Sequence, residues 1–400
     1  QEQVKFLLQK SLENHEWRQK NCINLIPSEM TQSSLVRLLQ ITDPCGRYAE
    51  HKELLAAFEQ EVFYYQGTEF IAWTEDRLVE EMKEFLGYPN VETRVISGQM
   101  ANMTVFSAIV DFINRTDRRS EPRRIPMVMN NHIGKGGHLS SQPMGALRDY
   151  ISKDPVTEKY SVINFPVLSE NPYCIDLEET ANLLERFDPE LIILGKSMIL
   201  HPEPVAGIKK IIDKKSSNSL IMYDMAHIIG LIGPHFQDPY AEGADIITGS
   251  THKTFFGSQR GVIGAAYEEG IPEFELWKTI ERRAFPGSVS NHHLGTLLGL
   301  LMSTIEMNAF KESYQPQILS NAKAFAKALA EEGLDVQGDP SVSFTETHQV
   351  VVVVGYAQGC AVAKELEESN IIVNCQAIPS DESFTSSSGI RMGVSEMTRF

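Results

Sequence analysis

The sequence predicts an α/β fold, because short apolar segments alternate with segments of helical periodicity along the chain. Four apolar runs have the length of central strands in a sheet that is buried on both faces: 191–194, 220–223, 245–248 and 262–265. Asp224 directly follows the second run, and Lys253 comes shortly after the third. Ligand sites in open α/β sheets gather at strand ends, so we expect a ligand site where these two residues meet.

Helical segments are expected on both sides of these strands. Residues 76–86 place their apolar side chains on one face, with Thr74 as the expected N-cap and Gly87 as the C-terminal stop. A second helix over 320–332 precedes an apolar strand over 349–354. A chain of 400 residues exceeds what one hydrophobic core usually organises, so we expect two domains that share a cleft.

Composition narrows the class of protein. The formal net charge of −17 argues against a nucleic-acid partner, which needs a basic face. No apolar run of about 18 residues and no leading signal pattern occur, so no membrane partner is expected and a cytoplasmic location is the default. The cysteines are scattered without a Cys-x-x-Cys pair, which predicts a reducing compartment, no disulfide framework and no metal site: Cys22, Cys45, Cys174, Cys360 and Cys375.

Asp224 and Lys253 together predict pyridoxal 5'-phosphate (PLP). A PLP enzyme needs an amine that forms a Schiff base with the cofactor and an acid that keeps the pyridine nitrogen protonated. Lys253 would supply the amine and Asp224 the acid, while His227 could hydrogen-bond to Asp224 or to a ring substituent. On these residues alone, a buried Asp that caps a turn and a solvated lysine would explain the pattern equally well.

Further motifs extend this interpretation over the chain. They are 25–29 (Leu-Ile-Pro-Ser-Glu), 47–50 (Arg-Tyr-Ala-Glu), 64–70 (Tyr-Tyr-Gln-Gly-Thr-Glu-Phe), 136–139 (Gly-Gly-His-Leu), 224–227 (Asp-Met-Ala-His), 251–254 (Thr-His-Lys-Thr), 285–287 (Phe-Pro-Gly) and 389–393 (Gly-Ile-Arg-Met-Gly). They occur in the order seen in serine hydroxymethyltransferases, so the chain resembles that family over nearly its whole length. Eight blocks in order are much harder to obtain by chance than any single block.

The resemblance implies the fold of PLP-dependent transferases of fold type I, which is aspartate aminotransferase-like. It implies a large domain with a mostly parallel seven-stranded sheet and a smaller α/β C-terminal domain. We expect an N-terminal arm over 1–55, a large PLP-binding domain over 56–284, and a linking helix with the small domain over 285–400. The chain opens at Gln1 and stops at Phe400, where the family continues, so we expect residues to be missing at both ends.

The resemblance also implies a reaction: the bond between Cα and Cβ of a β-hydroxy amino acid is cleaved or formed through a glycine quinonoid, with one-carbon transfer to tetrahydrofolate or a related pterin. The amino acid would be serine, glycine or threonine. By resemblance Glu50 transfers protons and Tyr65 contacts the substrate, with Ser28, Tyr48 and Tyr64 nearby. These groups usually come from the neighbouring subunit, which implies a homodimer with shared active sites.

Arg391 is the candidate for the substrate carboxylate, because a guanidinium matches a carboxylate with two parallel hydrogen bonds. Phosphate binding is expected from backbone amides at a helix start, and Ser97, Gly98 and Gln99 lie where a strand passes into a helix over 100–113. Gln99 and Met100 replace the family's usual Ser-Gln. Three further residues are expected at the cofactor: Ser250 and His252 at the phosphate, and Ser197 at the phenolic oxygen.

Two departures from the family bear on function. Lys135 takes the place of a histidine in the motif that carries the ring-stacking residue, so Lys135, His132 or His138 would lie over the ring. Ser290 and Asn291 replace a Gly-Gly pair that helps to hold phosphate across the dimer. Ser-Asn at this point resembles the L-threonine transaldolases, as does 345–349 (Thr-Glu-Thr-His-Gln), whereas 372–379 resembles the folate enzyme.

Two alternatives therefore stay open. One is a folate-independent L-threonine transaldolase or threonine aldolase, which shares the first half of the reaction. The other is a non-catalytic member of the family that serves as a scaffold or regulator. A scaffold has no physical need for an unpaired buried lysine, which costs several kcal/mol when it stays charged. The joint presence of the catalytic candidates argues against a scaffold: Asp224, Lys253, Glu50, Tyr65 and Arg391.

Overall fold

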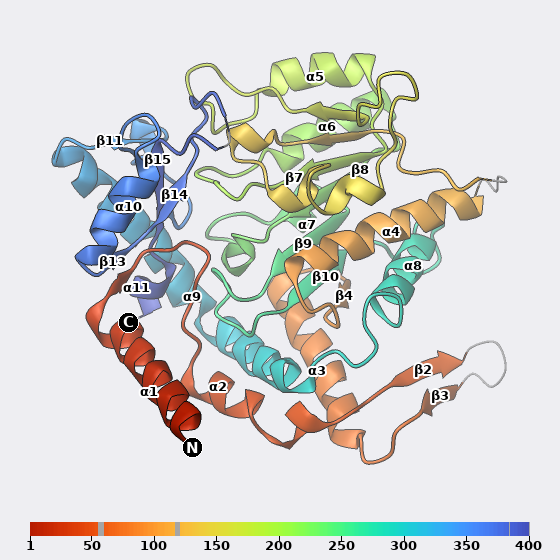
Figure 1. The fold of residues 1–400 in the computed structure, drawn as a ribbon. Helices are drawn as coiled ribbons and strands as arrows, with labels where there is room; N and C mark the ends of the chain where they lie inside the picture. The colour runs from red at the N-terminus through yellow and green to blue at the C-terminus, as the bar shows by residue number, and fades with distance from the viewer. Residues whose placement is uncertain (55–59, 117–120, 384, 400) are drawn as a thin grey trace.

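The computed structural model describes residues 1–54, 60–116, 121–383 and 385–399 (Figure 1). Its largest element is a seven-stranded sheet in the order β4-β10-β9-β8-β7-β5-β6. The run from β9 to β6 is parallel, and β10 is antiparallel to both of its neighbours. The predicted α/β fold with a mostly parallel seven-stranded sheet is therefore confirmed. The strands are β4 (Asn90–Glu92), β5 (Val128–Asn130), β6 (Val162–Asn164), β7 (Leu191–Leu194), β8 (Leu220–Asp224), β9 (Ile246–Ser250) and β10 (Gly261–Ala265).

This sheet is buried on both faces. Alternate residues of β7 enter different apolar clusters, with Ile192 and Leu194 in one and Leu191 and Ile193 in the other. The first cluster includes side chains of α3 (Glu69–Leu86), α5 (Leu177–Arg186), α6 (Val205–Lys215) and α9 (Leu294–Glu331). The second includes side chains of α4 (Gly98–Thr116) and α8 (Phe274–Ala284). Burial on both faces explains why the strands read as continuous apolar runs in the sequence.

A second, four-stranded antiparallel sheet follows in the order β11-β12-β15-β14. A third apolar cluster joins this sheet to Leu25 and to Ala326 near the end of α9. Because α9 also contributes Leu294 and Leu297 to the first cluster, one helix of 38 residues links both sheets. The elements of this part are β11 (Asp335–Val336), β12 (Gln349–Val353), α10 (Gly359–Glu368), β13 (Ile371–Ile372), β14 (Asn374–Gln376), β15 (Gly389–Gly393) and α11 (Ser395–Arg399), whereas the short α7 (Pro239–Glu242) lies between β8 and β9 in the chain.

The N-terminal segment runs along the outside of this body. It contains α1 (Glu2–Glu16), β1 (Ile23–Asn24), α2 (Ser34–Gln40) and a hairpin of β2 (His51–Leu54) and β3 (Gln60–Phe63). Strand β1 pairs in parallel with β13, close to the other end of the chain. Helix α1 buries none of its side chains, and both α1 and the hairpin lie at the margin of the molecule (Figure 1). The expected domain boundary between residues 55 and 56 lies outside the described residues.

Two helices differ from their predicted bounds. Helix α3 begins at Glu69, so the prediction of Thr74 as its N-cap is wrong: Thr74 lies inside the helix and its Oγ1 donates to the carbonyl of Phe70 at 2.7 Å. The predicted stop at Gly87 is confirmed by its left-handed φ of +74°. The helix expected over 320–332 is the last part of α9, which continues through Pro316. Burial of Tyr314 and Ile318 on either side of this proline holds the helix together.

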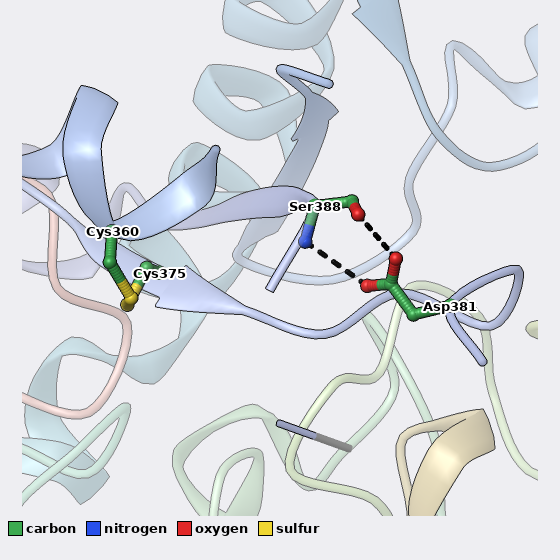
Figure 2. The surroundings of a disulfide bond; sticks show 4 residues. All are labelled: Cys360, Cys375, Asp381 and Ser388. Carbon is green, nitrogen blue, oxygen red and sulfur yellow. Dashed lines mark hydrogen bonds between the residues drawn. A yellow bond between two sulfur atoms is a disulfide. The ribbon is translucent and has the colours of Figure 1, made fainter. Parts of the chain in front are cut away.

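The expectation of no disulfide is wrong. Cys360 on α10 and Cys375 on β14 form a disulfide with a Cα–Cα distance of 5.1 Å (Figure 2). Their separation of 15 residues carries no recognisable motif, and only the packing of α10 against β14 brings them together. Cys22, Cys45 and Cys174 are free. Among the described residues, no helix is long and apolar enough to span a membrane, and no group of three metal-binding side chains occurs.

Candidate active site

The ends of β8 and β9 bring the two principal candidates to one edge of the sheet. Asp224 is the last residue of β8, and Lys253 follows the last residue of the parallel neighbour β9 by three positions. The backbone is tightly packed here. Gly195, which follows β7, has a φ of +123°, and a Cβ at this position would lie 2.1 Å from the carbonyl oxygen of Asp224. Only glycine fits this approach.

Asp224 is a fully enclosed carboxylate with several donors. Its Oδ2 interacts with Nδ1 of His138 at 2.5 Å and accepts from Nδ2 of Asn102 at 2.8 Å, while its Oδ1 accepts from the amide of Ala226 at 3.1 Å. Burial acts to raise the pKa of Asp224, but His138 and these hydrogen bonds outweigh it and hold the pKa below its ordinary value. The site therefore holds a fixed negative charge.

Lys253 is half-buried beside this charge. Burial lowers the pKa of Lys253 to about 8, the Asp224 carboxylate acts to raise it, and the Arg391 guanidinium lowers it further. Within the described part of the chain, Lys253 makes no hydrogen bond or ion pair. About one-tenth of an amine with this pKa is neutral at pH 7, a far larger share than in an ordinary lysine, so Lys253 is the more available nucleophile.

Two buried histidines whose pKa values are lowered, His227 and His348, lie near the lysine. Burial, with the nearby Lys253 cation, lowers the pKa of His227 well below its usual range, and its Nδ1 has no partner among the described residues. The rings of His227 and His138 lie nearly perpendicular at 5.9 Å. Burial also lowers the pKa of His348 to about 3, and its Nε2 donates to the carbonyl of Pro27 at 3.1 Å. His227 and His348 therefore stay uncharged at neutral pH, beside the cations of Lys253 and Arg391.

Arg391 projects from β15 toward the large sheet. Its Nε donates to Oδ1 of Asn374 on the neighbouring strand at 3.1 Å, and its Nη1 donates to the carbonyl of Ser197. The residue is buried, and burial lowers the pKa of Arg391 to about 10, so it stays charged at neutral pH. A buried guanidinium that has no carboxylate partner in the described part of the chain fits the binding of an external carboxylate.

The start of α4 lies against the end of β9. The Oγ of Ser97 accepts from the amide of Met100 at 3.1 Å and so caps the helix. Gly98 packs so closely on Ser250 that a Cβ would lie 2.2 Å from the serine Oγ. The N-terminus of α4 therefore lies at the end of β9, three residues before Lys253, and a helix N-terminus is favourable for a phosphate. The side chain of Gln99 is exposed.

The three candidates for stacking on the ring have different surroundings. His132 is exposed, and its Nδ1 accepts from the amide of Gly134 at 3.1 Å. Lys135 donates from Nζ to the carbonyl of Pro379 at 2.5 Å. Only His138 contacts Asp224, through the 2.5 Å interaction.

A second group of candidates lies apart from Lys253. The Oδ1 of Asn291 accepts from the amide of Ala49 at 3.3 Å, and the rings of Tyr48 and Tyr65 lie 4.8 Å apart. The hydroxyls of Tyr48 and Ser290 are 3.5 Å apart. Tyr48, Tyr64 and Tyr65 are 44%, 59% and 41% exposed, and the carbonyl of Glu50 accepts from the amide of Tyr64. No contact joins the group to Lys253 among the described residues.

Ser28 and His252 are brought together in a third place, the lining of a cavity of about 320 Å³. Arg18 and Glu29 form an ion pair in the same lining. Burial, with the Lys253 cation, lowers the pKa of His252 to about 4, and its Nδ1 has no partner among the described residues. The cavity thus connects the N-terminal motif with the residue next to Lys253.

Sequence reasoning missed three residues that support the site: Asn102, Asn374 and His348. Asn102 orients Asp224 and accepts through its own Oδ1 from Thr248 at 2.6 Å. Its position inside an apolar helix was the available signal, since a buried amide needs partners. Asn374 and His348 lie within the segments 372–379 and 345–349, which resemble relatives. The contact of Asn374 depends on the pairing of β14 with β15, and that of His348 depends on the position of Pro27.

The residues present fit PLP. Lys253 is an amine of lowered pKa without a partner among the described residues, Asp224 is a fixed carboxylate, and the buried Nδ1 atoms of His227 and His252 likewise lack a hydrogen-bond partner there. A helix N-terminus close to Ser250 offers a phosphate site. Fold and site together define a PLP-dependent enzyme of fold type I.

Comparison with known proteins identifies the family. A family model described as serine hydroxymethyltransferase matches residues 2–400. Serine hydroxymethyltransferases of Pyrobaculum aerophilum and Archaeoglobus fulgidus are 38% and 37% identical, over 100% and 97% of this chain and 85% and 81% of their own lengths. The chain belongs to the serine hydroxymethyltransferase family, and it is an enzyme of the hydroxymethyltransferase and aldolase type rather than a scaffold.

The chain is also similar to a solved structure. The L-threonine transaldolase of Pseudomonas fluorescens superposes with a TM-score of 0.81 at 26% identity, covering all of this chain and 83% of its own. The fold of this chain is thus also that of an L-threonine transaldolase.

Proposed function

We propose that this enzyme transfers a one-carbon unit between serine and a tetrahydropterin, with glycine as the other amino acid. The observation that carries the choice of acceptor is the similarity over the full chain. The chain is 38% identical to a serine hydroxymethyltransferase but 26% identical to the transaldolase of the same fold. The tail at 372–379, which resembles the folate enzyme, points the same way.

Lys253 and Asp224 would hold the two reactive ends of the cofactor. Bound PLP supplies an electron-withdrawing ring that stabilises negative charge on the Cα of the amino acid. The lowered pKa of Lys253 leaves a neutral amine ready to attach the cofactor and to move a proton at Cα. Asp224, kept ionised by His138 and Asn102, would favour a protonated pyridine nitrogen.

We assign His138 to stack on the face of the cofactor ring, and the start of α4 to bind the cofactor phosphate. His138 is the stacking candidate that contacts Asp224, while Lys135 is engaged with Pro379. The amides that follow Ser97 and the close approach of Gly98 to Ser250 support the phosphate assignment. The exposed side chain of Gln99 adds little to it.

Arg391 would bind the substrate carboxylate. Its guanidinium is buried and charged, and its contacts with Asn374 and Ser197 fix its direction. A carboxylate held there would place Cα next to Lys253, whose pKa Arg391 already influences. Ser28, which lines the cavity beside His252, is assigned to the same end of the substrate.

The active enzyme is proposed to be a homodimer with shared sites. The side chains of Tyr64 and Tyr65, which lie near Glu50, are widely exposed in the single subunit. Asn291 and Ser290 fix the segment that carries Tyr48, away from Lys253 of the same chain. Glu50 of a second subunit would then move the proton at the β-hydroxyl, and its Tyr65 would contact the substrate. Helix α1, which buries nothing in the subunit, supports association as well.

A transaldolase or threonine aldolase is the second candidate function. Ser290 and Asn291, the motif at 345–349 and the structural neighbour favour it. In that motif Thr347 turns inward and its Oγ1 donates to the carbonyl of Ile199 at 2.7 Å. Thr347 therefore supports the backbone next to the site. In this second candidate function, an aldehyde would be the acceptor in place of the pterin.

The decisive test is the visible spectrum of the PLP-loaded enzyme with glycine, before and after addition of tetrahydrofolate. A long-wavelength band that tetrahydrofolate strengthens supports the hydroxymethyltransferase. A band that ignores tetrahydrofolate, together with release of acetaldehyde from threonine, would replace that proposal by the aldolase or transaldolase. Threonine with a second aldehyde then separates these two, because only a transaldolase forms the new β-hydroxy amino acid efficiently.

A cytoplasmic location is part of the same proposal. The free thiols of Cys22, Cys45 and Cys174 support it, whereas the Cys360–Cys375 disulfide counts against a strongly reducing compartment. Fractionation of the source cells with an antibody to this chain would test it, and recovery outside the cytoplasmic fraction would contradict it.

A further inference from the structure

Lys135 departs from the family motif and has a contact that joins the two sheets. Its Nζ donates at 2.5 Å to the carbonyl of Pro379, which follows β14 of the small sheet. Lys135 itself lies in the turn that leads to His138 and hence to Asp224. One lysine thus connects the turn at the cofactor end of the site with the sheet that carries Arg391.

The loop that receives Lys135 is internally fixed. The Oδ2 of Asp381 accepts from the amides of Ile378 and Ser388 at 2.9 and 3.1 Å, and Ser388 Oγ donates to the Oδ1 of Asp381 (Figure 2). Ile378 packs with Met198 and other residues in a small apolar cluster between the sheets. Movement of Pro379 is therefore passed on to Ser388, the residue that directly precedes β15.

These contacts form a closed path that begins and ends at Lys135 and passes through Arg391. Gly136, next to Lys135, accepts from the amide of Ser197 at 2.9 Å, and the carbonyl of Ser197 accepts from Arg391. Arg391 lies three residues after Ser388, so the path returns through Asp381 and Pro379 to Lys135. The disulfide anchors β14, which leads into the loop, to α10. A break at Lys135 would leave Arg391 supported from one side.

We propose that Lys135 is a positioning residue for the amino-acid carboxylate: it fastens residues 377–383 to the turn at 133–138 and, through the contacts of Asp381 with Ser388, holds Arg391 at its working position. The inference rests on the proposed role of Arg391 and adds a residue that acts through it. It also replaces the expectation that Lys135 lies over the cofactor ring. The two roles differ in what a substitution changes, namely amino-acid affinity or cofactor binding.

The test compares the PLP-loaded forms of the wild type, Lys135→Met, Lys135→Arg and the control Lys159→Met, which removes an exposed lysine. The glycine dissociation constant is read from the change in cofactor absorption, which needs no acceptor. Loss of one charge-assisted hydrogen bond predicts about tenfold weaker glycine binding in Lys135→Met. Lys135→Arg keeps a charged donor and should restore binding to within about twofold, and Lys159→Met should match the wild type.

Three more readouts separate positioning from other roles. The PLP affinity and resting spectrum of Lys135→Met should be unchanged, and for serine KM should rise while kcat stays within about twofold, because Lys135 touches no reacting atom. Hydrogen exchange of the peptide over 377–388 should become faster in the apoenzyme. Asp381→Asn, which loosens the same loop from its other side, should weaken glycine binding in the same direction and does not depend on the folding of Lys135→Met.

Two outcomes would overturn the inference while the proposed function stands: glycine affinity equal to the wild type in both Lys135→Met and Asp381→Asn, or an altered cofactor spectrum with unchanged glycine affinity, which would put Lys135 on the ring. A wild type that gives no response to glycine would overturn the proposed function and the inference with it.

Discussion

Two cations and one carboxylate set the protonation of the site at the scale of single residues. Burial and Arg391 lower the pKa of Lys253, and Asp224 partly opposes them. With a pKa of about 8, roughly half of the lysine is a neutral amine at pH 8, whereas an ordinary lysine with a pKa near 10.4 is almost fully protonated there. The neutral amine is the form that attacks the cofactor aldehyde.

The pH dependence of cofactor capture follows from this shift. When apoenzyme is mixed with PLP in a stopped-flow instrument, the rate of covalent attachment should rise through about pH 8 and level off above it. Asp224→Asn removes the charge that raises the pKa, so its midpoint should lie lower. Lys253→Ala should retain no cofactor after borohydride reduction. A midpoint near that of a free lysine would contradict the assigned environment of Lys253.

Arg391 provides the second prediction at this scale. Arg391→Lys keeps the charge but loses the planar fork that meets a carboxylate with two hydrogen bonds. Loss of one such bond to a charged group is worth about 1.5–3 kcal/mol, so KM for serine should rise roughly 10- to 150-fold with a smaller change in kcat. Arg186→Lys, on the exposed side of α5, is the matched control. An unchanged KM would remove Arg391 from the carboxylate site.

At the scale of elements, the strands were predictable because each is a local apolar run, and Asp224 and Lys253 were predictable because they follow two of these runs directly. Side chains whose role depends on contacts between distant parts of the chain could not be predicted from the sequence. Asn102 reaches Asp224 from a helix 122 residues earlier in the chain, and Asn374 supports Arg391 only through the register of β14 and β15. Lys135 was identified by its departure from the family, but its partner Pro379 lies 244 residues away.

The disulfide between α10 and β14 has a measurable effect on stability. A cross-link that closes a loop of 15 residues limits the unfolded chain and contributes about 3 kcal/mol. The free energy of unfolding of oxidised Cys360→Ser/Cys375→Ser, measured with urea, should therefore be lower than that of the oxidised wild type by about this amount. Reduced wild type should match the variant, which makes it the control.

Thiol titration tests the same element without any substitution. The denatured, unreduced wild type should react at three cysteines, Cys22, Cys45 and Cys174, and at all five after reduction. Five reactive thiols before reduction, in protein prepared without reductant, would show that Cys360 and Cys375 are not joined.

The whole molecule is expected to work as a pair. If Lys253 of one subunit acts with Glu50 of the other, mixing two inactive variants, Lys253→Ala and Glu50→Gln, creates one intact site in each mixed dimer. Random exchange then restores about a quarter of the wild-type activity, because half of the dimers are mixed and each has one working site of two. Recovery should appear only after subunits are exchanged by dilution and reassembly. A mixture that stays inactive after proven exchange would place both residues in one subunit's site.

The pairing of β1 with β13 has a consequence for how the chain is made. Strand β13 is synthesised about 350 residues after β1, since Ile23 pairs with Ile371. At 5–20 residues per second, the N-terminal segment waits roughly 20–70 s on the ribosome before its partner exists. Throughout that time the strand edge of β1 stays unpaired, and Leu25 joins its core only after the strands that follow residue 335 have been made.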